Sequence, residues 1–248
     1  MTKNATKQKL SALNILGVRI DNLEKKEILR RIKNCLIGNN FYQIATVNPE
    51  IILAAQKDEE YKKVLNSCDL NVADGIGIKL AFWRYGKKLK TRITGADLMG
   101  EILRIANNKG LKVFLTVNKN GLSSYEEVSA SIKKVYPTIK ISGVNWDKEI
   151  SPSQFQIDNF EGCKVIFCNF GHPHQELFLN KQKDAIIGVA MGVGGSFDFW
   201  TGKQRRAPFW MRKIGLEWFF RLIQQPKRIK RIFNAIVIFP LKLIFNNK

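Results

Sequence analysis

The chain has 248 residues, 45% of them hydrophobic, with 41 Lys and Arg against 21 Asp and Glu. This length and apolar content suit one domain with a full core and leave room for a small appendage. The net charge of +20 implies an anionic partner: nucleic acid, a phosphorylated substrate or an acidic membrane surface. Composition alone does not choose among them.

Cysteine spacing and hydropathy argue against several other classes. The four cysteines are scattered and form no C-x-x-C pair, so neither a zinc site nor a disulfide framework is expected. The Lys-rich segment Met1–Leu13 shows no signal peptide. The apolar stretch Ile232–Phe245 is too short to cross a bilayer and contains Pro240 and Lys242. We expect a protein on the cytoplasmic side that touches a membrane without crossing it.

Short apolar segments alternate with amphipathic ones through the middle of the chain. In chain order, the pattern predicts a strand at Phe41–Val47, a helix over 48–65, a strand at Leu70–Ala73, a helix from Gly95 to Asn107, a strand at Leu111–Val117, a helix over 123–135, a strand at Ile139–Val144, a short helix opened by Ser151 and Pro152, a strand at Cys163–Phe170, a helix at Pro173–Lys183 and a strand at Ala185–Met191. Thr94 is expected to cap its helix, with Asp97 at the third position of a capping box. This alternation predicts an α/β fold with a largely parallel sheet.

The last fifth of the chain has a different character. Residues 203–248 contain twelve Lys and Arg and one acid, Glu217, which gives this segment a net charge of +11. We therefore divide the chain into an α/β core over residues 1–202 and a basic helical appendage over 203–248.

Polar groups follow two of the predicted strands. Thr46-Val-Asn48 ends one strand, and Asp74 ends the next. Open parallel sheets bind ligands at the carboxyl ends of their strands, where a carboxylate can act as general base for a sugar hydroxyl. Asn48 and Asp74 are equally well explained as helix N-caps, and local sequence leaves both alternatives open.

Three further motifs lie at predicted turns. Arg92 precedes a helix N-terminus, a place suited to phosphate, although a surface arginine explains it too. The turn at Gly171–Glu176 holds both histidines, which lack further metal ligands, and it is better suited to presenting Gln175 to a ligand. The glycines around Gly194 allow a nucleotide to approach the backbone, or they simply form a tight turn.

The appendage combines arginines with aromatic residues. Trp218, Phe219 and Phe220 suit the headgroup level of a membrane. Arg228 and Arg231 are three residues apart and share a helix face that can bind a diphosphate, although a solvated basic face is the ordinary explanation. The chain contains no Asp-x-Asp, so no Mg²⁺ or Mn²⁺ site is evident, and arginines would have to stabilise a leaving group.

Taken in order, these motifs resemble the WecG/TagA/CpsF family of bacterial glycosyltransferases (glycosyltransferase family 26). The resemblance covers about residues 15–235 and rests on Thr46-Val-Asn48-Pro-Glu, Asp74-Gly75, Arg92-x-x-Gly95-x-Asp97-Leu, Gly171-x-Pro-x-Gln175-Glu176, Gly192-Val-Gly194-Gly195-x-Phe-Asp198, Arg206-Ala-Pro208, Gly215-Leu-Glu217-Trp218, Arg221 and Pro226-x-Arg228. His174 stands where the family typically has Lys.

The resemblance implies a Rossmann-like core, a UDP-sugar donor and an undecaprenyl-diphosphate-linked acceptor, with transfer of an N-acetylmannosaminyl-type sugar in teichoic acid or surface polysaccharide synthesis. By analogy, it implies Asp74 as the catalytic base. One general base and no candidate covalent nucleophile favour inversion, and the missing Asp-x-Asp predicts a metal-independent reaction that needs no cofactor. Substrates would then be met by Thr46, Asn48, Arg92, Gln175, Gly194, Arg221, Arg228 and Arg231. The implied location is peripheral, on the inner face of the cell membrane.

Three alternatives to N-acetylmannosaminyl transfer fit parts of the sequence. A different UDP-hexose donor for capsule or exopolysaccharide would fit the same family. A nucleic-acid-binding protein would explain the charge, but no nucleic-acid-binding signature is present and the basic segment is also apolar. A dinucleotide oxidoreductase would need a complete glycine fingerprint. The sequence leaves the sugar, the acceptor glycan and the oligomeric state, including a homo-oligomer, open.

Overall fold

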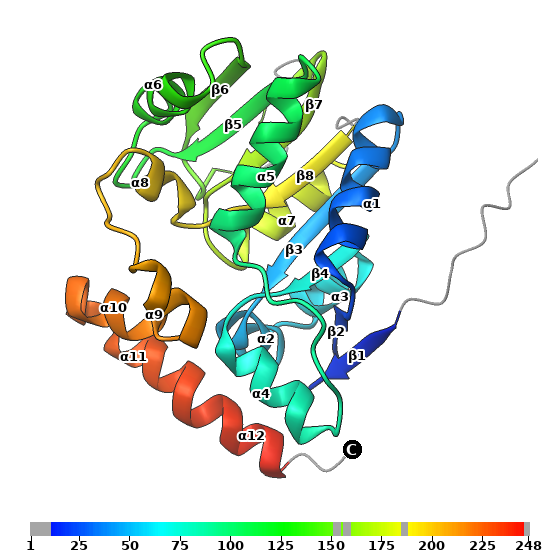
Figure 1. Cartoon of the computed structure of the whole chain (residues 1–248), viewed down its shortest axis with the longest axis vertical. Helices are drawn as coiled ribbons and strands as arrows, with labels where there is room; N and C mark the ends of the chain where they lie inside the picture. The colour runs from blue at the N-terminus through cyan, green and yellow to red at the C-terminus, as the bar shows by residue number, and fades with distance from the viewer. Residues whose placement is uncertain (1–10, 151–154, 156–159, 185–187, 246–248) are drawn as a thin grey trace, which may run out of the picture.

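A six-stranded parallel sheet forms the centre of the molecule (Figure 1). The computed structural model describes residues 11–150, 155, 160–184 and 188–245. The strand order is β4-β3-β8-β7-β5-β6, with the strands at β3 (Phe41–Val47), β4 (Leu70–Ala73), β5 (Lys112–Asn118), β6 (Lys140–Trp146), β7 (Cys163–Cys168) and β8 (Gly188–Gly192). The predicted α/β fold with a parallel, Rossmann-like sheet is confirmed, and each predicted strand is present within a few residues of its expected bounds.

Helices cover both faces of the sheet. One face packs against α1 (Lys25–Ile37), α5 (Gly95–Asn108) and α6 (Tyr125–Val135). The other face packs against α2 (Pro49–Ala55), α3 (Glu59–Ser67), α4 (Ile76–Arg84) and α7 (His174–Lys181). Strand side chains alternate between the two layers, so that Ile44 lies in the first and Ala45 in the second. Every strand of the sheet is thus flanked by apolar packing.

Some elements differ from those predicted. The helix expected over 48–65 is two helices, because Asp58 caps α3 by accepting a hydrogen bond from the Tyr61 amide at 2.9 Å. An antiparallel hairpin, β1 (Ala12–Ile15) and β2 (Val18–Asp21), precedes α1 and was not predicted. The short helix expected from Ser151 and Pro152 falls outside the described residues.

The N-terminus of α5 has the predicted cap. The Thr94 hydroxyl accepts a hydrogen bond from the Asp97 amide at 3.2 Å and donates to the Asp97 carboxylate at 2.8 Å. Along the helix, Leu98, Met99 and Ile102 are buried against the sheet. The cap therefore fixes where α5 begins, and this start lies at the carboxyl edge of the sheet beside β4.

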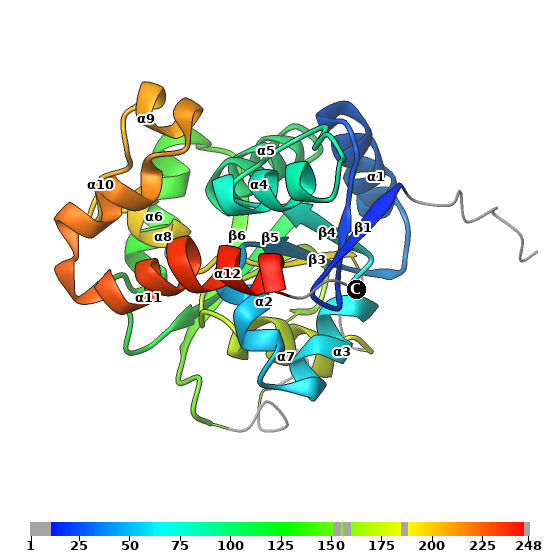
Figure 2. The same ribbon diagram turned by 90° about the horizontal axis from the view of Figure 1, so that it is seen from below.

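The appendage is helical and lies along the lower edge of the core in Figure 1; Figure 2 shows it from below, with α12 crossing in front of the core. The core ends with α8 (Ser196–Trp200), and the elements of the appendage are α9 (Phe209–Ile214), α10 (Glu217–Gln224), η3 (Pro226–Arg228), α11 (Ile229–Phe233), η4 (Asn234–Ile238) and α12 (Phe239–Phe245). Phe239 and Leu243 of α12 are buried in the same apolar cluster as Ile78 and Phe82 of α4. The end of the appendage is therefore part of the second core layer. Among the described residues, no helix is long and apolar enough to span a membrane.

Candidate active site

The carboxyl ends of β3 and β4 bring the first predicted site residues together. Val47 and Ala73 are paired across these strands, and the Asp74 amide donates to the Val47 carbonyl at 2.8 Å. Asn48 and Asp74 directly follow this pair. Parallel pairing therefore fixes Asp74 at the edge of the sheet where such folds bind ligands.

Asp74 is a partly exposed carboxylate that faces the start of α5. The Gly95 amide donates to its Oδ2 at 3.4 Å, and an alanine Cβ at Gly95 would lie only 3.1 Å from Oγ1 of buried Thr46. The missing side chain thus lets α5 approach both β3 and β4. Of the two alternatives for Asp74, the helix cap does not apply, because Gly75 holds the N-cap position of α4.

The pKa of Asp74 is raised from its usual 3.8 to about 6. Desolvation is the largest cause, and the negative charge of Glu217 adds to it. Arg221, the Gly95 amide and Arg92 act in the opposite direction. A carboxyl group with this pKa is ionised near neutral pH and is a stronger base than an ordinary aspartate, as general base catalysis requires.

Asn48 and Gln175 have structural partners. Oδ1 of Asn48 caps α2 by accepting from the Ile51 amide at 3.0 Å, so the capping alternative is confirmed. Gln175 is buried; its Oε1 accepts from the Gly171 and Gly194 amides at 3.2 and 3.0 Å. Its Nε2 donates to the Glu176 carboxylate at 2.7 Å. The glutamine therefore joins the loops after β7 and β8, and a direct contact of either side chain with substrate stays a prediction.

The appendage places its predicted arginines near this edge. Arg221 pairs with Glu217 at 2.9 Å and stacks over the Phe199 ring with 5.1 Å to the centroid. Arg231 pairs with Glu50 of α2 at 2.6 Å. Arg228 is half-buried, and among the described residues its guanidinium group has neither a hydrogen bond nor an ion pair. It is the appendage arginine best placed to take an anionic partner.

Arg228 lies in a strongly basic environment. Desolvation, followed by the neighbouring charges of Arg231 and Arg221, lowers its pKa. The guanidinium remains a cation, because the ordinary pKa of arginine lies so far above neutral pH. An unpaired, partly desolvated cation near two others is unfavourable, and a bound anion would relieve this repulsion.

His172 belongs to the same region. Its Nε2 lies 3.7 Å from Oε2 of Glu50, and neither ring nitrogen has a hydrogen-bond partner within the described residues. Burial favours a higher pKa for Glu50, but His172 and Arg231 outweigh it, and the pKa falls to about 2.

His174, the other histidine, begins α7. In the part of the chain that the structure describes, no three His, Cys, Asp or Glu residues are grouped to hold a metal ion.

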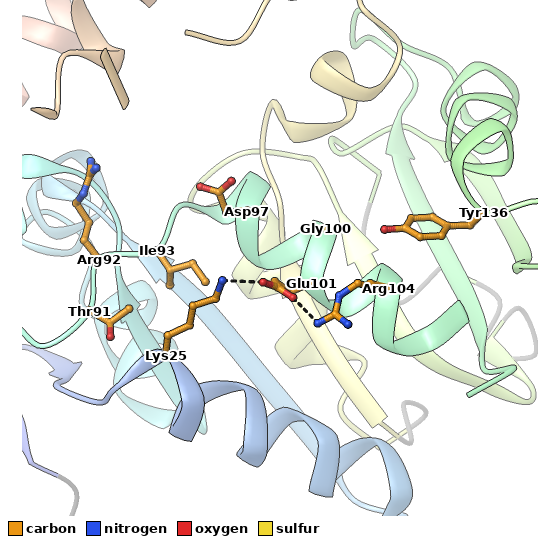
Figure 3. Close-up of a pocket in the computed structure, with 9 residues that line it drawn as sticks. All are labelled: Lys25, Thr91, Arg92, Ile93, Asp97, Gly100, Glu101, Arg104 and Tyr136. Carbon is orange, nitrogen blue, oxygen red and sulfur yellow. Dashed lines mark hydrogen bonds and ion pairs between the residues drawn. The ribbon is translucent and has the colours of Figure 1, made fainter. Parts of the chain in front are cut away.

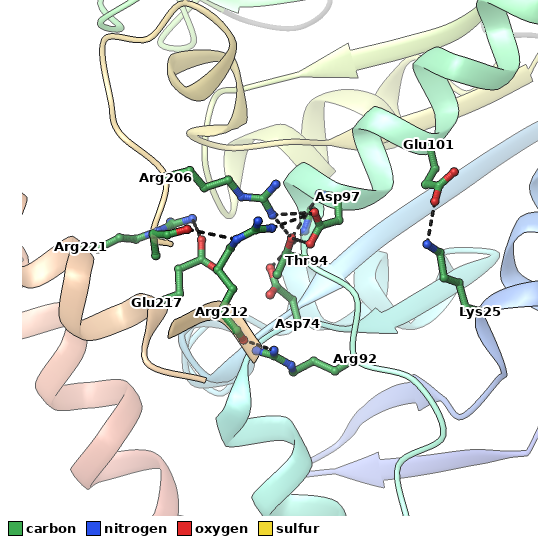
Figure 4. A network of polar contacts seen from close by, with 12 residues as sticks. Lys25, Asp74, Arg92, Thr94, Asp97, Glu101, Arg206, Arg212, Glu217 and Arg221 are labelled. Atoms are coloured by element: carbon green, nitrogen blue, oxygen red, sulfur yellow. Dashed lines mark hydrogen bonds and ion pairs between the residues drawn. The ribbon is translucent and has the colours of Figure 1, made fainter. Parts of the chain in front are cut away.

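The sequence did not predict the contacts that attach the appendage to α5 (Figure 4). Arg206 and Arg212 both reach Asp97, at 2.8 and 3.5 Å. Arg92, predicted to bind phosphate, donates to the main-chain carbonyl of Arg212. One signal was present in the sequence: Asp97 and Arg206 both belong to motifs that carry the family resemblance. Their contact could not be predicted, because more than 100 residues separate them along the chain.

Two surface hollows lie against α5, and Asp74 lines neither of them. The larger, about 430 Å³ (Figure 3), is lined by Lys25, Thr91, Arg92, Ile93, Asp97, Gly100, Glu101, Arg104 and Tyr136. Its Glu101 is bound by Lys25 at 2.7 Å and by Arg104 at 2.8 Å. The smaller, about 330 Å³, is lined by Ala96, Asp97, Gly100, Phe199, Trp200 and Arg206. The candidate active site is therefore placed by the Asp74 carboxylate and its neighbours at the carboxyl ends of β3 and β4, and not by either hollow.

A desolvated carboxylate at the edge of a parallel sheet, with arginines of the appendage near it, is an arrangement suited to group transfer from a phosphorylated substrate. The profile of the glycosyl transferase WecG/TagA/CpsF family matches residues 13–248, and the chain belongs to this family. It is a glycosyltransferase, as the sequence predicted.

Two relatives match most of this chain and have specific names. A Bacillus subtilis (strain 168) protein is 37% identical over 220 residues, which cover 87% of this chain and 81% of the relative. A Staphylococcus aureus (strain MRSA252) protein is 33% identical over 237 residues, covering 93% and 91%. Each is named an N-acetylglucosaminyldiphosphoundecaprenol N-acetyl-beta-D-mannosaminyltransferase.

Proposed function

We propose that this enzyme transfers an N-acetylmannosaminyl group from a UDP-sugar to N-acetylglucosaminyl-diphosphoundecaprenol, in the synthesis of teichoic acid or another surface polysaccharide. The names of the relatives support the transferred sugar and the acceptor. The observation in the molecule that carries the proposal is the Asp74 carboxylate, held at the sheet edge by the Gly95 amide and raised in pKa to about 6.

In the proposed reaction, Asp74 takes the proton of an acceptor hydroxyl. The hydroxyl oxygen forms a bond to the anomeric carbon of the donor while the bond from that carbon to the diphosphate oxygen breaks. UDP leaves with the electron pair. One base and one displacement invert the anomeric centre, in keeping with the β-linked product in the names of the relatives.

We assign stabilisation of the departing diphosphate to arginines and not to a metal ion. Arg228 is half-buried without an ion partner among the described residues, and Arg221 and Arg231 lie close enough to lower its pKa. Arginine binds phosphate oxygens with paired N–H donors. Under this proposal residues 203–248 complete the active site of the core, and transfer requires no cofactor.

We also propose that the enzyme is peripheral, on the inner face of the cell membrane where its lipid acceptor lies. Large apolar side chains are exposed along the appendage and the adjoining α4: Leu80, Trp83, Phe209, Trp210, Ile214, Phe219, Ile223, Ile229, Phe233, Ile236, Val237, Leu241, Ile244 and Phe245. The same segment carries most of the excess positive charge. Apolar side chains beside Lys and Arg are typical of proteins that bind anionic bilayers.

The test is a panel of UDP-sugars offered with a short-chain, diphosphate-linked N-acetylglucosamine acceptor. We expect transfer from UDP-N-acetylmannosamine, and we expect it to continue in EDTA. Transfer from a different UDP-hexose alone would instead assign the enzyme to capsule or exopolysaccharide synthesis. Loss of activity in EDTA with recovery in Mn²⁺ would overturn the role given to the arginines.

A further inference from the structure

The arginine-bearing part of the appendage has little packing of its own. Neither α10, which carries Arg221, nor η3, which carries Arg228, contains a buried residue. Burial of apolar side chains is the main force that fixes a helix in place. Apart from the stacking of Arg221 over Phe199, the position of these two arginines therefore depends on how the two ends of the α10–η3 span are attached.

The downstream end is held by the core. Phe239 is fully buried in the second core layer, and Arg231 pairs with Glu50 at 2.6 Å. Residues following η3 are thus fixed by apolar burial together with an ion pair.

The upstream end combines the burial of Ala207 and Met211 with polar contacts to the first turn of α5. Nη2 of Arg206 lies 2.8 Å from Oδ1 of Asp97 and donates to the Thr94 hydroxyl at 3.0 Å. Nη1 of Arg212 reaches the same Asp97 oxygen at 3.5 Å. Figure 4 shows both guanidinium groups converging on this carboxylate, with Asp74 beside it.

The same turn of α5 therefore serves two purposes. Its first amide, that of Gly95, donates to the base Asp74, and its Asp97 side chain receives the appendage. The Asp97 side chain remains 43% exposed. Ion pairs exposed to this degree are weaker than buried ones, so this attachment can open and close.

We propose that Asp97 is a positioning residue, whose carboxylate docks Arg206 and Arg212 and so holds Arg221 and Arg228 over the active site. This inference rests on the proposed function for its effect on catalysis, but docking itself is a property of the chain alone. Asp97 touches neither substrate in this account. It acts only through the segment that it holds.

A matched control lies one turn further along α5. Glu101 is also a carboxylate with two cationic partners, Lys25 at 2.7 Å and Arg104 at 2.8 Å. Both partners belong to the core, and neither is in the appendage. Glu101→Gln therefore removes a similar pair of contacts from the same helix without touching the upstream attachment.

The experiment is a double-mutant cycle of Asp97→Asn and Arg206→Gln in the full chain. Each single variant should lower kcat on the short-chain acceptor by about tenfold, typical of losing one charged hydrogen bond, with little change in KM for the donor. The double variant should be no worse than Asp97→Asn, because the contact can be lost only once. Glu101→Gln should keep wild-type kcat.

Hydrogen exchange measures docking without relying on activity. Amides of residues 209–228 should exchange faster in Asp97→Asn and Arg206→Gln than in the wild type or Glu101→Gln. A roughly hundredfold loss in the double variant, the product of two independent effects, would overturn the proposal, as would unchanged exchange in Asp97→Asn. If the wild-type enzyme transfers no sugar, the proposed function fails, while the exchange data still decide the role of Asp97.

Discussion

Asp74 combines a desolvated setting with a proposed task, acceptance of a proton, that needs its charge. Its folded pKa of about 6 exceeds the usual 3.8, so the folded state binds the proton more tightly than the unfolded chain does. Ionisation therefore lowers the stability of the fold as pH rises from about 3.8 to 6, and the full penalty remains above that range. The ionised form of Asp74, which a general base requires, therefore lowers the stability of the fold near neutral pH.

Asp74→Asn tests both the proposed role of the carboxylate in catalysis and its effect on stability. The amide keeps the shape and loses the basicity, so turnover should fall by roughly two to four orders of magnitude while UDP affinity changes little. At pH 8 the variant should melt at a higher temperature than the wild type, and at pH 4 this gain should shrink. Thermal melts at the two pH values and a UDP titration give the measurements; near-normal turnover would refute the assignment of the base.

Glu217 offers a second test, through the pH dependence of the rate. Its negative charge is the second cause of the raised Asp74 pKa, after desolvation, while Arg221 opposes it. Glu217→Gln should lower the pKa of Asp74, so the acidic limb of kcat/KM should move to lower pH. Arg221→Gln should move that limb to higher pH. Profiles from pH 5 to 9 check both; movement of the two limbs in the same direction would contradict this electrostatic account.

At the scale of elements, residues around strand ends could be predicted more readily than those that join distant segments. Apolar runs identify β3 and β4, and parallel pairing then dictates that Asp74 lies at the ligand-binding edge. The β1–β2 hairpin carries no such signal, because its turn is Leu16-Gly17, with Leu16 at a φ of 49°, in place of the usual Asn-Gly. The sequence could not predict the Asp97 contacts, which depend on tertiary packing.

The loops after β7 and β8 depend on close packing between Gln175 and Gly192. A Cβ added at Gly192 would lie 2.4 Å from Nε2 of the buried glutamine, which already holds the Gly171 and Gly194 amides. Gly192→Ala should therefore displace Gln175 and lower the free energy of unfolding by about 1–3 kcal/mol.

Gly100→Ala is the matched control for that change. An added Cβ at Gly100, within α5, meets no atom within 4 Å, so alanine should raise stability by up to about 1 kcal/mol through its better helix propensity. Urea unfolding of both variants measures the difference. A Gly192→Ala variant as stable as the wild type would show that Gln175 can move aside without loss.

The appendage contributes side chains both to the core and to the proposed membrane surface. Phe239 and Leu243 face inward to the second core layer, while Phe233 and Leu241 of the same helical run are exposed. Removing residues 203–248 would therefore expose the apolar cluster around α4 as well as abolish membrane contact. For this reason point substitutions on the outer face test the membrane role more clearly than truncation.

Phe233→Asp and Trp83→Asp place a carboxylate on that outer face, at side chains that are 52% and 79% exposed. Each should weaken sedimentation with anionic vesicles by about tenfold or more, because apolar burial is lost and a like charge is added. Binding by the wild type should weaken with added salt, since basic residues near an anionic surface contribute about 1 kcal/mol each. Turnover of the short-chain acceptor should stay close to that of the wild type, because this substrate needs no bilayer.

Ile37→Asp supplies the comparison that makes this test specific. Ile37 is 69% exposed at the end of α1, just before β3 begins, and thus lies at the amino edge of the sheet, opposite the active site. The same change in hydrophobicity and charge there should leave vesicle binding intact. If all three variants lose binding equally, net charge alone governs association. If none does, the exposed face of α4 and the appendage is not the membrane surface, and the lipid acceptor must be reached by another face of the enzyme.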